Sequence, residues 1–490
     1  MGIIALSNAK SVKGLKYRDH FDYILDKHHL QDKDGFINEV DDLIEGIRPQ
    51  YNALIRRISG MGNKLAQDTI AIPSTSSNSE IPKIKVWDIG YLYSKFENTK
   101  EFEFANIAKE GSYDLTKVIC AAQKNFESST GYVIKECENS NIGNNSDTKH
   151  IKWRPCVKKY QLTPKNKDDD DDDDGNKQHP NMYIYLDMFC ANEQTAPDDS
   201  FQYIHSIDAG HRIPCIAIYL PIVDPRCQTF GSAQITFDEA ILVFEMFGKI
   251  AYYATFRPEF LPSHHHHKST KTGAIENPNF KLELFKTTFV NFIYQPNVLR
   301  DIVASRHKLT DLNSNKPKDD DGFVQASNEL MALNRYKVII DAMKCLVTWK
   351  FAEYLYSNIN SKDFGKNQLF RKYYHDLTTK YTLLDYDVNS NEAPFTKNTE
   401  LLYLTYSCQQ PYFELWARLV YANVYHKLKN QNTDTNADVV GEIEGFMNNL
   451  CCSVRPSEEK DVNDSSFESQ IEVLLGATIQ LDIWSYFTQP

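Results

Sequence analysis

Residues 236–253 read Thr236-Phe237-Asp238-Glu239-Ala240-Ile241-Leu242-Val243-Phe244-Glu245-Met246-Phe247-Gly248-Lys249-Ile250-Ala251-Tyr252-Tyr253. The first four residues form a capping box, in which a hydroxyl and a carboxylate three residues later satisfy backbone N–H groups at the start of a helix. The residues that follow are apolar on every side of that helix, apart from Glu245 and Lys249. A helix without a polar face is buried, so this segment predicts a helix inside a larger body.

Helical patterns dominate the rest of the chain. Apolar residues recur at helical spacing between Tyr17 and Met61, and the pattern is again mostly helical from Thr236 onward. Two stretches rich in β-branched and aromatic residues, Tyr183–Phe189 and Ile213–Val223, predict strands. We therefore expect a mainly α fold, a multi-helix body with one small β-sheet lining a cleft.

Composition excludes several classes of function. The chain has 490 residues, of which 41% are hydrophobic and 24% charged, as in ordinary globular proteins. A net charge of −12 without a basic stripe argues against nucleic-acid binding. No apolar run reaches the roughly 20 residues that a membrane span requires. Ten scattered cysteines without a C-x-x-C pair indicate reduced thiols inside a cell, so we expect a cytoplasmic protein, with a mitochondrial one as the alternative.

Two stretches are low in complexity. Asn139–Asn145 and Lys165–Pro180 are rich in Asn or Asp and predict solvated surface inserts. The Asp run does not match a calcium-binding EF-hand, because position 181, six residues past its Gly, is Asn181 instead of Glu.

The frame of residues 236–253 resembles the metal-binding helix of the thimet oligopeptidase and mitochondrial intermediate peptidase family of zinc metallopeptidases. The family helix reads T-F-D-E, a few apolar residues, and then F-H-E-F-G-H-A. The two zinc histidines of the family fall on Glu245 and Lys249, and its general-base glutamate falls on Met246. Three other positions of the second part are kept without a gap, Phe244, Phe247 and Gly248, and Ala251 lies one position past the family's alanine.

These replacements remove the chemistry of the motif. In H-E-x-x-H, two imidazoles at i and i+4 hold zinc, and the glutamate takes a proton from the bound water. The thioether of Met246 cannot accept that proton, and the ammonium of Lys249 repels a cation. The simplest interpretation of Glu245 and Lys249 is an i, i+4 ion pair, which stabilises a helix by about 0.2–0.5 kcal/mol.

The resemblance implies that one zinc ligand survives. The third ligand of the family, a glutamate on the following helix, falls on Glu283 when positions are counted back from Pro296. We therefore expect Lys249 to bridge Glu245 and Glu283 as a charge substitute for the metal.

A second motif of the family, Y-Y-x-Y-L-W, supplies tyrosines that donate hydrogen bonds to the oxyanion of the transition state. On this motif the first tyrosine is replaced by Pro411, the second is retained as Tyr412, and the third is replaced by Glu414. Metal ligands, base and oxyanion donors are thus degraded together. The resemblance consequently implies a pseudopeptidase with no intact catalytic residue and no cofactor.

The resemblance extends in order along nearly the whole chain. Trp87–Tyr93 and Trp153–Val157 resemble other motifs of the family, and Tyr183–Phe189 resembles an edge strand of its cleft. Full-length members carry a further helical segment before the point where this chain begins. We therefore expect either a truncated product or a partner protein that covers the open cleft.

The resemblance also implies a domain division. Residues 1–80 would be a helical segment of the channel wall, and residues 81–235 would hold helices and the small sheet with its low-complexity inserts. Residues 236–490 would form a helical, zincin-like domain of the catalytic type.

Three functions follow as hypotheses. The first is a non-catalytic peptide- or protein-binding scaffold, in which an extended peptide adds to the sheet edge at Tyr183–Phe189 and Tyr412 grips side chains. The alternative is an active zinc metalloendopeptidase of oligopeptides with a rewired site, using Glu245, Glu283 and one histidine of His264–His267. A third is a protein without activity that serves only assembly, or a product without selected function.

Overall fold

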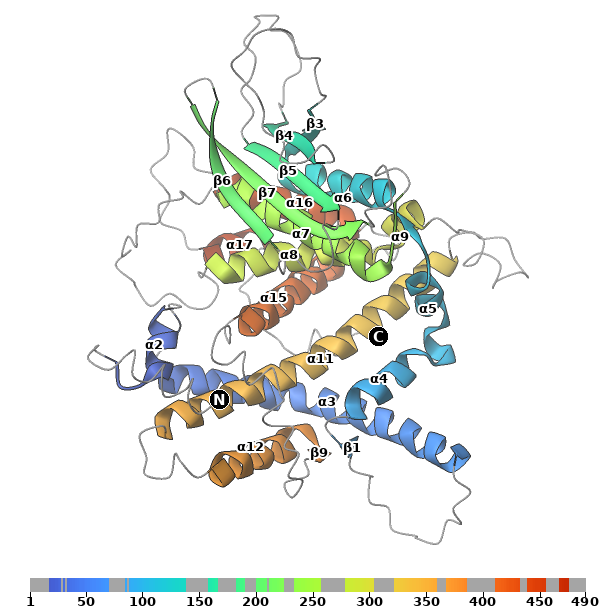
Figure 1. The fold of residues 1–490 in the computed structure, drawn as a ribbon, viewed down its shortest axis with the longest axis vertical. Coiled ribbons are helices and arrows are strands. Elements are labelled where there is room, and N and C mark those ends of the chain that lie inside the picture. Colours follow the sequence, from blue (N-terminus) through green and yellow to red (C-terminus); the bar gives the residue numbers. More distant parts are fainter. Residues whose placement is uncertain are drawn as a thin grey trace, which may run out of the picture.

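A computed structural model describes residues 17–27, 30, 33–69, 84–85, 88–137, 157–165, 182–189, 200–208, 211–223, 233–256, 278–303, 321–358, 367–385, 410–431, 439–454 and 467–475. Within these ranges the chain forms thirteen α-helices, one five-stranded mixed sheet and two short two-stranded ladders (Figure 1). The predicted mainly α fold with a small sheet is confirmed at this level. No helix in the described ranges is long and apolar enough to cross a membrane.

One group of helices is built around the long helix α11 (Figure 1). Its members, with the short 3-10 turn η2, are α2 (His20–Lys27), α3 (Lys33–Thr69), α4 (Ile89–Glu97), η2 (Lys100–Phe102), α5 (Glu103–Lys109), α11 (Asp321–Asn358) and α12 (Asn367–Thr382). Helix α3 was expected from the apolar spacing before Met61, and it buries that stripe: Phe36, Val40, Leu43, Ile44 and Ile47. The helical prediction for this region is therefore confirmed.

A second group of helices lies next to the five-stranded sheet, which α6 and α7 contact (Figure 1). Its members are α6 (Leu115–Thr130), α7 (Phe237–Phe256), α8 (Pro278–Ile293), α9 (Pro296–Ile302), α15 (Gln410–Gln431), α16 (Val439–Val454) and α17 (Phe467–Leu475). Helix α7 begins as the capping box predicts. The backbone N–H of Thr236 donates to Glu239 Oε2 at 2.7 Å, and the N–H of Glu239 donates to Thr236 Oγ1 at 3.3 Å. Its burial on most sides is also confirmed.

The five-stranded sheet has the order β3-β4-β5-β7-β6. Strands β5 and β7 are parallel, and the other neighbours are antiparallel. The strands are β3 (Tyr132–Glu136), β4 (Lys158–Pro164), β5 (Met182–Phe189), β6 (Ser200–Asp208) and β7 (His211–Val223). Both predicted strands are thus present, as β5 and β7.

The expected place of β5 in the sheet is wrong. We predicted an edge strand at Tyr183–Phe189, whereas β5 pairs with β4 on one side and β7 on the other. The chain forms the antiparallel pair β6–β7 after β5, and β7 then lies beside β5 with Tyr183 opposite Cys215. Among the described strands the edges are β3 and β6. A peptide cannot add to β5, because both of its hydrogen-bonding sides are already used.

Two short ladders tie the ends of other elements. Strand β2 (Tyr113–Asp114) pairs antiparallel with β8 (Gln234–Ile235), so the starts of α6 and α7 lie next to each other. Strand β1 (Ile84–Lys85) pairs in parallel with β9 (Leu384–Asp385).

One hydrophobic core runs through both helix groups, from Phe21 to Ile471. It includes an aromatic cluster at the centre of the first group, where Phe36, Trp349 and Tyr412 lie with ring centroids 5.0–5.9 Å apart. Residues from all three predicted domains, 1–80, 81–235 and 236–490, contribute to this core. The division of the chain into these domains stays a prediction.

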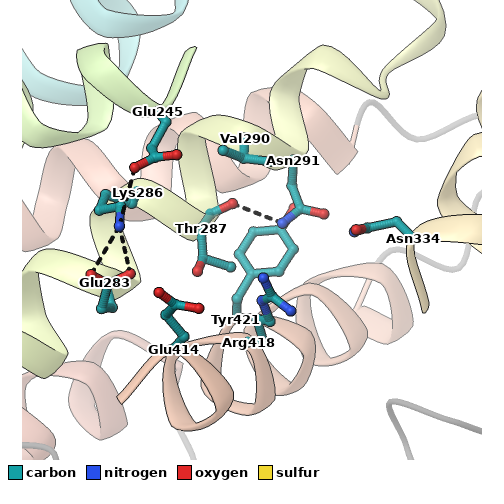
Figure 2. A pocket seen from close by; sticks show the side chains of 10 residues that line it. All are labelled: Glu245, Glu283, Lys286, Thr287, Val290, Asn291, Asn334, Glu414, Arg418 and Tyr421. Carbon is teal, nitrogen blue, oxygen red and sulfur yellow. Dashed lines mark hydrogen bonds and ion pairs between the residues drawn. The ribbon is translucent and has the colours of Figure 1, made fainter. Parts of the chain in front are cut away.

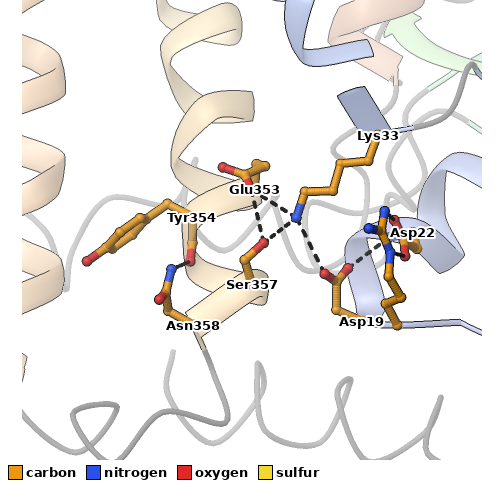
Figure 3. A network of polar contacts seen from close by, with 8 residues as sticks. Asp19, Asp22, Lys33, Glu353, Tyr354, Ser357 and Asn358 are labelled. Carbon is orange, nitrogen blue, oxygen red and sulfur yellow. Dashed lines mark hydrogen bonds and ion pairs between the residues drawn. The ribbon is translucent and has the colours of Figure 1, made fainter. Parts of the chain in front are cut away.

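Polar contacts fasten the N-terminal helices to α11 (Figure 3). Lys33 at the start of α3 lies 2.9 Å from Glu353 Oε1 and 3.5 Å from Asp19 Oδ2, and it also contacts the hydroxyl of Ser357. The contacts of Lys33 with Glu353 and Ser357 join residues more than 300 positions apart in the sequence. They fix the outer end of α11 against α3.

Several predicted features lie outside the described residues. These are the solvated inserts at 139–145 and 166–180, the histidine run His264–His267 and the motif at Trp153.

Candidate functional site

The polar residues of the candidate site lie on one face of each of three helices, α7, α8 and α15. Together with Asn334 of α11 they enclose a pocket of about 130 Å³ (Figure 2). Its lining is Glu245 of α7, Glu283, Lys286, Thr287, Val290 and Asn291 of α8, Asn334 of α11, and Glu414, Arg418 and Tyr421 of α15. The residues of α8 and α15 are spaced by three or four positions, so each set shares one helix face.

Gly248 brings α7 and α8 close together at the site. A Cβ atom at this position would lie 2.8 Å from both the Cα of Lys286 and the carbonyl oxygen of Phe285. Both are backbone atoms, which cannot move aside without shifting α8. Because Gly248 has no side chain, α7 and α8 approach closely enough for the ammonium of Lys286 to contact the carboxylate of Glu245.

Lys286 lies between Glu245 and Glu283, the two carboxylates that we expected Lys249 to bridge in place of a metal (Figure 2). Its ammonium is 2.9 Å from both oxygens of Glu283 and 3.1 Å from Oε1 of Glu245. The expectation that Lys249 bridges these two carboxylates is therefore wrong. Lys286 is on the same helix as Glu283, three residues on, and it reaches Glu283 from the side that faces α7.

Lys249 forms the simpler contact that the spacing indicated. Its ammonium lies 3.4 Å from Oε1 of Glu245, which confirms the i, i+4 ion pair. Together with Met246 and Glu245 it lines a second, smaller cavity of about 20 Å³ between α7 and β7. Glu245 thus stands between the two cavities and contacts a lysine on each side.

Burial and charge act against each other at these residues. Glu283 is 5% exposed and Lys286 is 8% exposed. Burial raises the pKa of Glu283, and the carboxylates of Glu414 and Glu245 add to that rise, while Lys286 opposes it without reversing it. For Lys286, burial opposes the charged form, but Glu245 and Glu283 outweigh it and raise the pKa of the ammonium.

The pKa of Glu245 is shifted downward, opposite to the pKa of Glu283. Burial alone would raise its pKa, but the ammonium groups of Lys286 and Lys249 outweigh that effect and lower the pKa of this carboxyl below its ordinary value. The group therefore stays ionised. Glu245, whose side chain is 22% exposed, and the buried Lys286 form an ion pair in which each charge compensates the desolvation of the other.

The residues that resemble the tyrosine motif lie on two faces of α15. Glu414 lines the pocket, whereas Tyr412 is fully buried on the opposite side and donates a hydrogen bond to Glu39 of α3. Residues two apart on a helix point about 200° from each other, which explains the division. Pro411 lies in the first turn of α15, and its side chain is outside the described part.

The prediction that Tyr412 grips a peptide is therefore wrong. Its ring packs against Phe36 and Trp349, and burial together with the Glu39 carboxylate raises its pKa far above the ordinary value. Tyr412 joins α15 to α3 and α11.

Seven of the ten residues that line the pocket were not predicted, and they include Lys286, Asn334 and Arg418. A signal was present for two of these three. Lys286 follows Glu283 by three positions, and Arg418 follows Glu414 by four, so each shares a helix face with a residue already singled out. Nothing local in the sequence connects Asn334 to the site, since α11 reaches the pocket only through the tertiary fold.

The residues that are described do not fit a zinc ion. The donor set would consist of carboxylates alone, and the ammonium of Lys286 already contacts both oxygens of Glu283. Among the described side chains no group of three His, Cys, Asp or Glu residues is arranged to hold a metal. The histidines that the alternative hypothesis requires, within His264–His267, lie outside the described residues.

Comparison of the sequence with known proteins found no matching family model and no significantly similar curated protein. The resemblance to the oligopeptidases thus depends on the residues and their spacing alone.

Proposed function

We propose that this chain is a catalytically silent relative of the thimet oligopeptidases that acts as a peptide- or protein-binding protein. The single observation that carries the proposal is the ammonium of Lys286, held by Glu245 and Glu283 at two of the positions that the resemblance assigns to metal ligands. A lysine at that point neutralises carboxylates that a zinc site would need.

The chemistry of the other positions supports the same proposal. The base position carries the buried thioether of Met246, which accepts no proton from water. Glu414 stands at an oxyanion-donor position, and a carboxylate there repels a developing negative charge. Binding remains available to such a pocket, because binding requires complementary groups and no proton transfer.

The proposed partner is a peptide or a protein, which contacts the molecule at or beside the pocket and covers it. The proposed compartment is the cytoplasm, with mitochondria as the alternative. This part of the proposal rests on the ten scattered cysteines, which form no C-x-x-C pair.

Peptidase activity and metal content should be measured on one preparation of the full chain, purified without a metal-affinity step. The substrate is a library of internally quenched peptides, tested with added zinc and with a zinc chelator. We expect no chelator-sensitive hydrolysis, and no stoichiometric zinc, iron or manganese by elemental analysis.

The matched control is Glu283→Gln, which removes the one ligand position that the resemblance retains. Hydrolysis that persists unchanged in Glu283→Gln comes from a contaminant. Zinc-dependent hydrolysis that chelator and Glu283→Gln both abolish contradicts the proposal and establishes the metalloendopeptidase alternative.

A further inference from the structure

Two charged side chains of the pocket remain without a partner in the described part of the chain. Glu414 and Arg418 form no ion pair or hydrogen bond there, although they lie one turn apart on α15 and both line the pocket. Glutamate followed by arginine at i, i+4 is a favourable order for a mutual ion pair. Their charged groups nevertheless stay apart, and Figure 2 shows the two side chains directed to different parts of the pocket.

The two ends of the pocket differ in charge. At one end Glu414 lies beside the Glu283–Lys286–Glu245 cluster, in which the charge of Lys286 is already shared by two carboxylates (Figure 2). At the other end Arg418 lies near the amides of Asn291 and Asn334. One end thus offers an uncommitted carboxylate, and the other offers an uncommitted guanidinium.

Two amide groups lie at the Arg418 end of the pocket. The side-chain nitrogen of Asn291 donates to the carbonyl of Thr287 at 2.7 Å, which leaves its side-chain oxygen to accept a hydrogen bond. Asn334 uses neither its side-chain oxygen nor its nitrogen within the described residues, so it adds both a donor and an acceptor.

The volume limits the size of the ligand. A pocket of about 130 Å³ is well above the roughly 10–15 Å³ that a single water molecule needs. It is below the roughly 300–1,000 Å³ of pockets that enclose drug-sized molecules. The occupant is therefore a molecule of a few heavy atoms.

We propose that this pocket binds a small zwitterion, an α-amino acid, with its ammonium on Glu414 and its carboxylate on Arg418. An α-amino acid carries opposite charges separated by one carbon atom, which matches a carboxylate and a guanidinium one helical turn apart. Arg418 receives the carboxylate as a fork of two N–H groups. The Asn334 amide, at the same end of the pocket as Arg418, donates to the carboxylate.

This inference deepens the proposed function and rests on it in one respect, that the pocket binds and does not catalyse. It names the chemistry that the pocket recognises in a peptide-related ligand. The two fail separately: chelator-sensitive hydrolysis refutes the silent site, whereas the absence of amino-acid binding refutes the zwitterion site alone.

The test is isothermal titration calorimetry of the full chain with glycine, L-alanine and L-serine at up to millimolar concentrations. Two analogues of alanine serve as probes of charge: alaninamide lacks the carboxylate, and N-acetylalanine lacks the ammonium. We expect at least one of the three amino acids to bind. We expect both analogues of alanine to bind about 10- to 100-fold more weakly than the zwitterion, because each leaves one charged group unpaired.

Variants assign the two ends. Arg418→Gln and Glu414→Gln should each weaken amino-acid binding about 10- to 100-fold, and Arg418→Lys should restore part of the loss because it keeps the charge but not the fork. Lys429→Gln is the matched control, since Lys429 is an exposed cation near the end of the same helix. Circular dichroism and the melting temperature establish that each variant is folded.

Two results overturn the zwitterion site. One is a folded wild-type chain that binds none of the three amino acids. The other is an amino-acid affinity that Arg418→Gln and Glu414→Gln leave unchanged, or alanine analogues that bind as tightly as alanine itself.

Discussion

The ammonium of Lys286 contacts three carboxylate oxygens on two helices, within 2.9–3.1 Å. Lysine is rarely this deeply buried unless its charge is paired. Here the pairing is complete, since Glu283 and Glu245 together supply the opposite charge. Removing the lysine alone would leave the buried carboxylate of Glu283 and the partly buried carboxylate of Glu245 to repel each other, which is the costly way to break such a cluster.

Restoring the zinc motif tests whether Lys286 blocks a metal. In the triple variant Glu245→His, Met246→Glu, Lys249→His, Glu283, at the position that the resemblance assigns to a ligand, remains paired with Lys286. We expect it to bind zinc weakly, and the further change Lys286→Ser to tighten binding about 10- to 100-fold, the range over which groups around metal ligands act. Competition with a chromogenic chelator measures the affinity.

The control for that comparison is Lys281→Ser in the same triple background, because Lys281 is also on α8 but does not line the pocket. Equal zinc affinity with and without Lys286 would show that Glu283 is not the ligand position. We expect no peptidase activity in any of these variants, since Pro411 and Glu414 are unchanged.

Glu245 gives a prediction about pH. Because the pKa of Glu245 lies below its ordinary value of 4.5, its carboxylate stabilises the folded state above that pH. This stabilisation is lost as the pH falls through the lowered pKa. Glu245→Gln should therefore reduce the free energy of unfolding by about 1–2 kcal/mol at pH 7, with the difference disappearing in acid.

Urea unfolding at a series of pH values measures this difference. The exposed Glu110 at the end of α5 supplies the control, and Glu110→Gln should change stability little at any pH. A difference for Glu245→Gln that stays constant from pH 7 into acid would mean that the ion pair with Lys286 and Lys249 contributes nothing.

At the scale of elements, the pocket depends on how closely α7 and α8 cross. Gly248 is the point of closest approach, with backbone atoms of α8 in the space that a side chain would need. Helix α15 then closes the pocket against α8. The sheet contributes through β7, which covers Glu245 and Lys249 from the other side.

Gly248→Ala should destabilise the protein by about 1–3 kcal/mol, because the added methyl group forces α8 away from α7. Gly445 of α16 is the matched control: a Cβ there meets nothing within 4 Å. Gly445→Ala should instead stabilise by about 0.5–1 kcal/mol through helix propensity. Denaturant unfolding of both variants measures the change in the free energy of unfolding. An equal change in the two variants would contradict the close crossing of α7 and α8.

At the scale of the whole molecule, one core joins the two helix groups. Trp349 of α11 is 1% exposed and packs against Phe21, Phe36 and Tyr412, which come from α2, α3 and α15. The aromatic cluster therefore connects the N-terminal helices to the helix that carries Glu414 and Arg418. The two groups should unfold together.

Trp349→Ala should lower the free energy of unfolding by about 3–5 kcal/mol, because it leaves a cavity at this junction. Tyr91, an aromatic residue that is 61% exposed, gives the control, and Tyr91→Ala should change stability by less than about 0.5 kcal/mol. Near-ultraviolet circular dichroism and tryptophan fluorescence follow the transition. Loss of one helix group before the other in the wild type would contradict a shared core.

Several elements could be predicted from the sequence because their signals are local. The capping box at Thr236, the apolar surface of α7 and the stripe of α3 are each visible within a few helical turns. The strands β5 and β7 were predictable from their β-branched and aromatic residues. The Glu245–Lys249 pair follows from spacing along one helix.

The neighbours of these elements depended on the tertiary structure. The strand order places β5 inside the sheet. Tyr412 and Glu414 lie on different faces of α15, and Tyr412 contacts Glu39 of α3. Because α7 and α8 cross closely at Gly248, the ion pair of Glu245 forms with Lys286 of α8. Patterns along a chain report which face of an element is apolar, but they carry no information about which element packs on that face. The pocket joins residues from 245 to 421, so its charges are defined only when the packing of α7, α8, α11 and α15 brings them together.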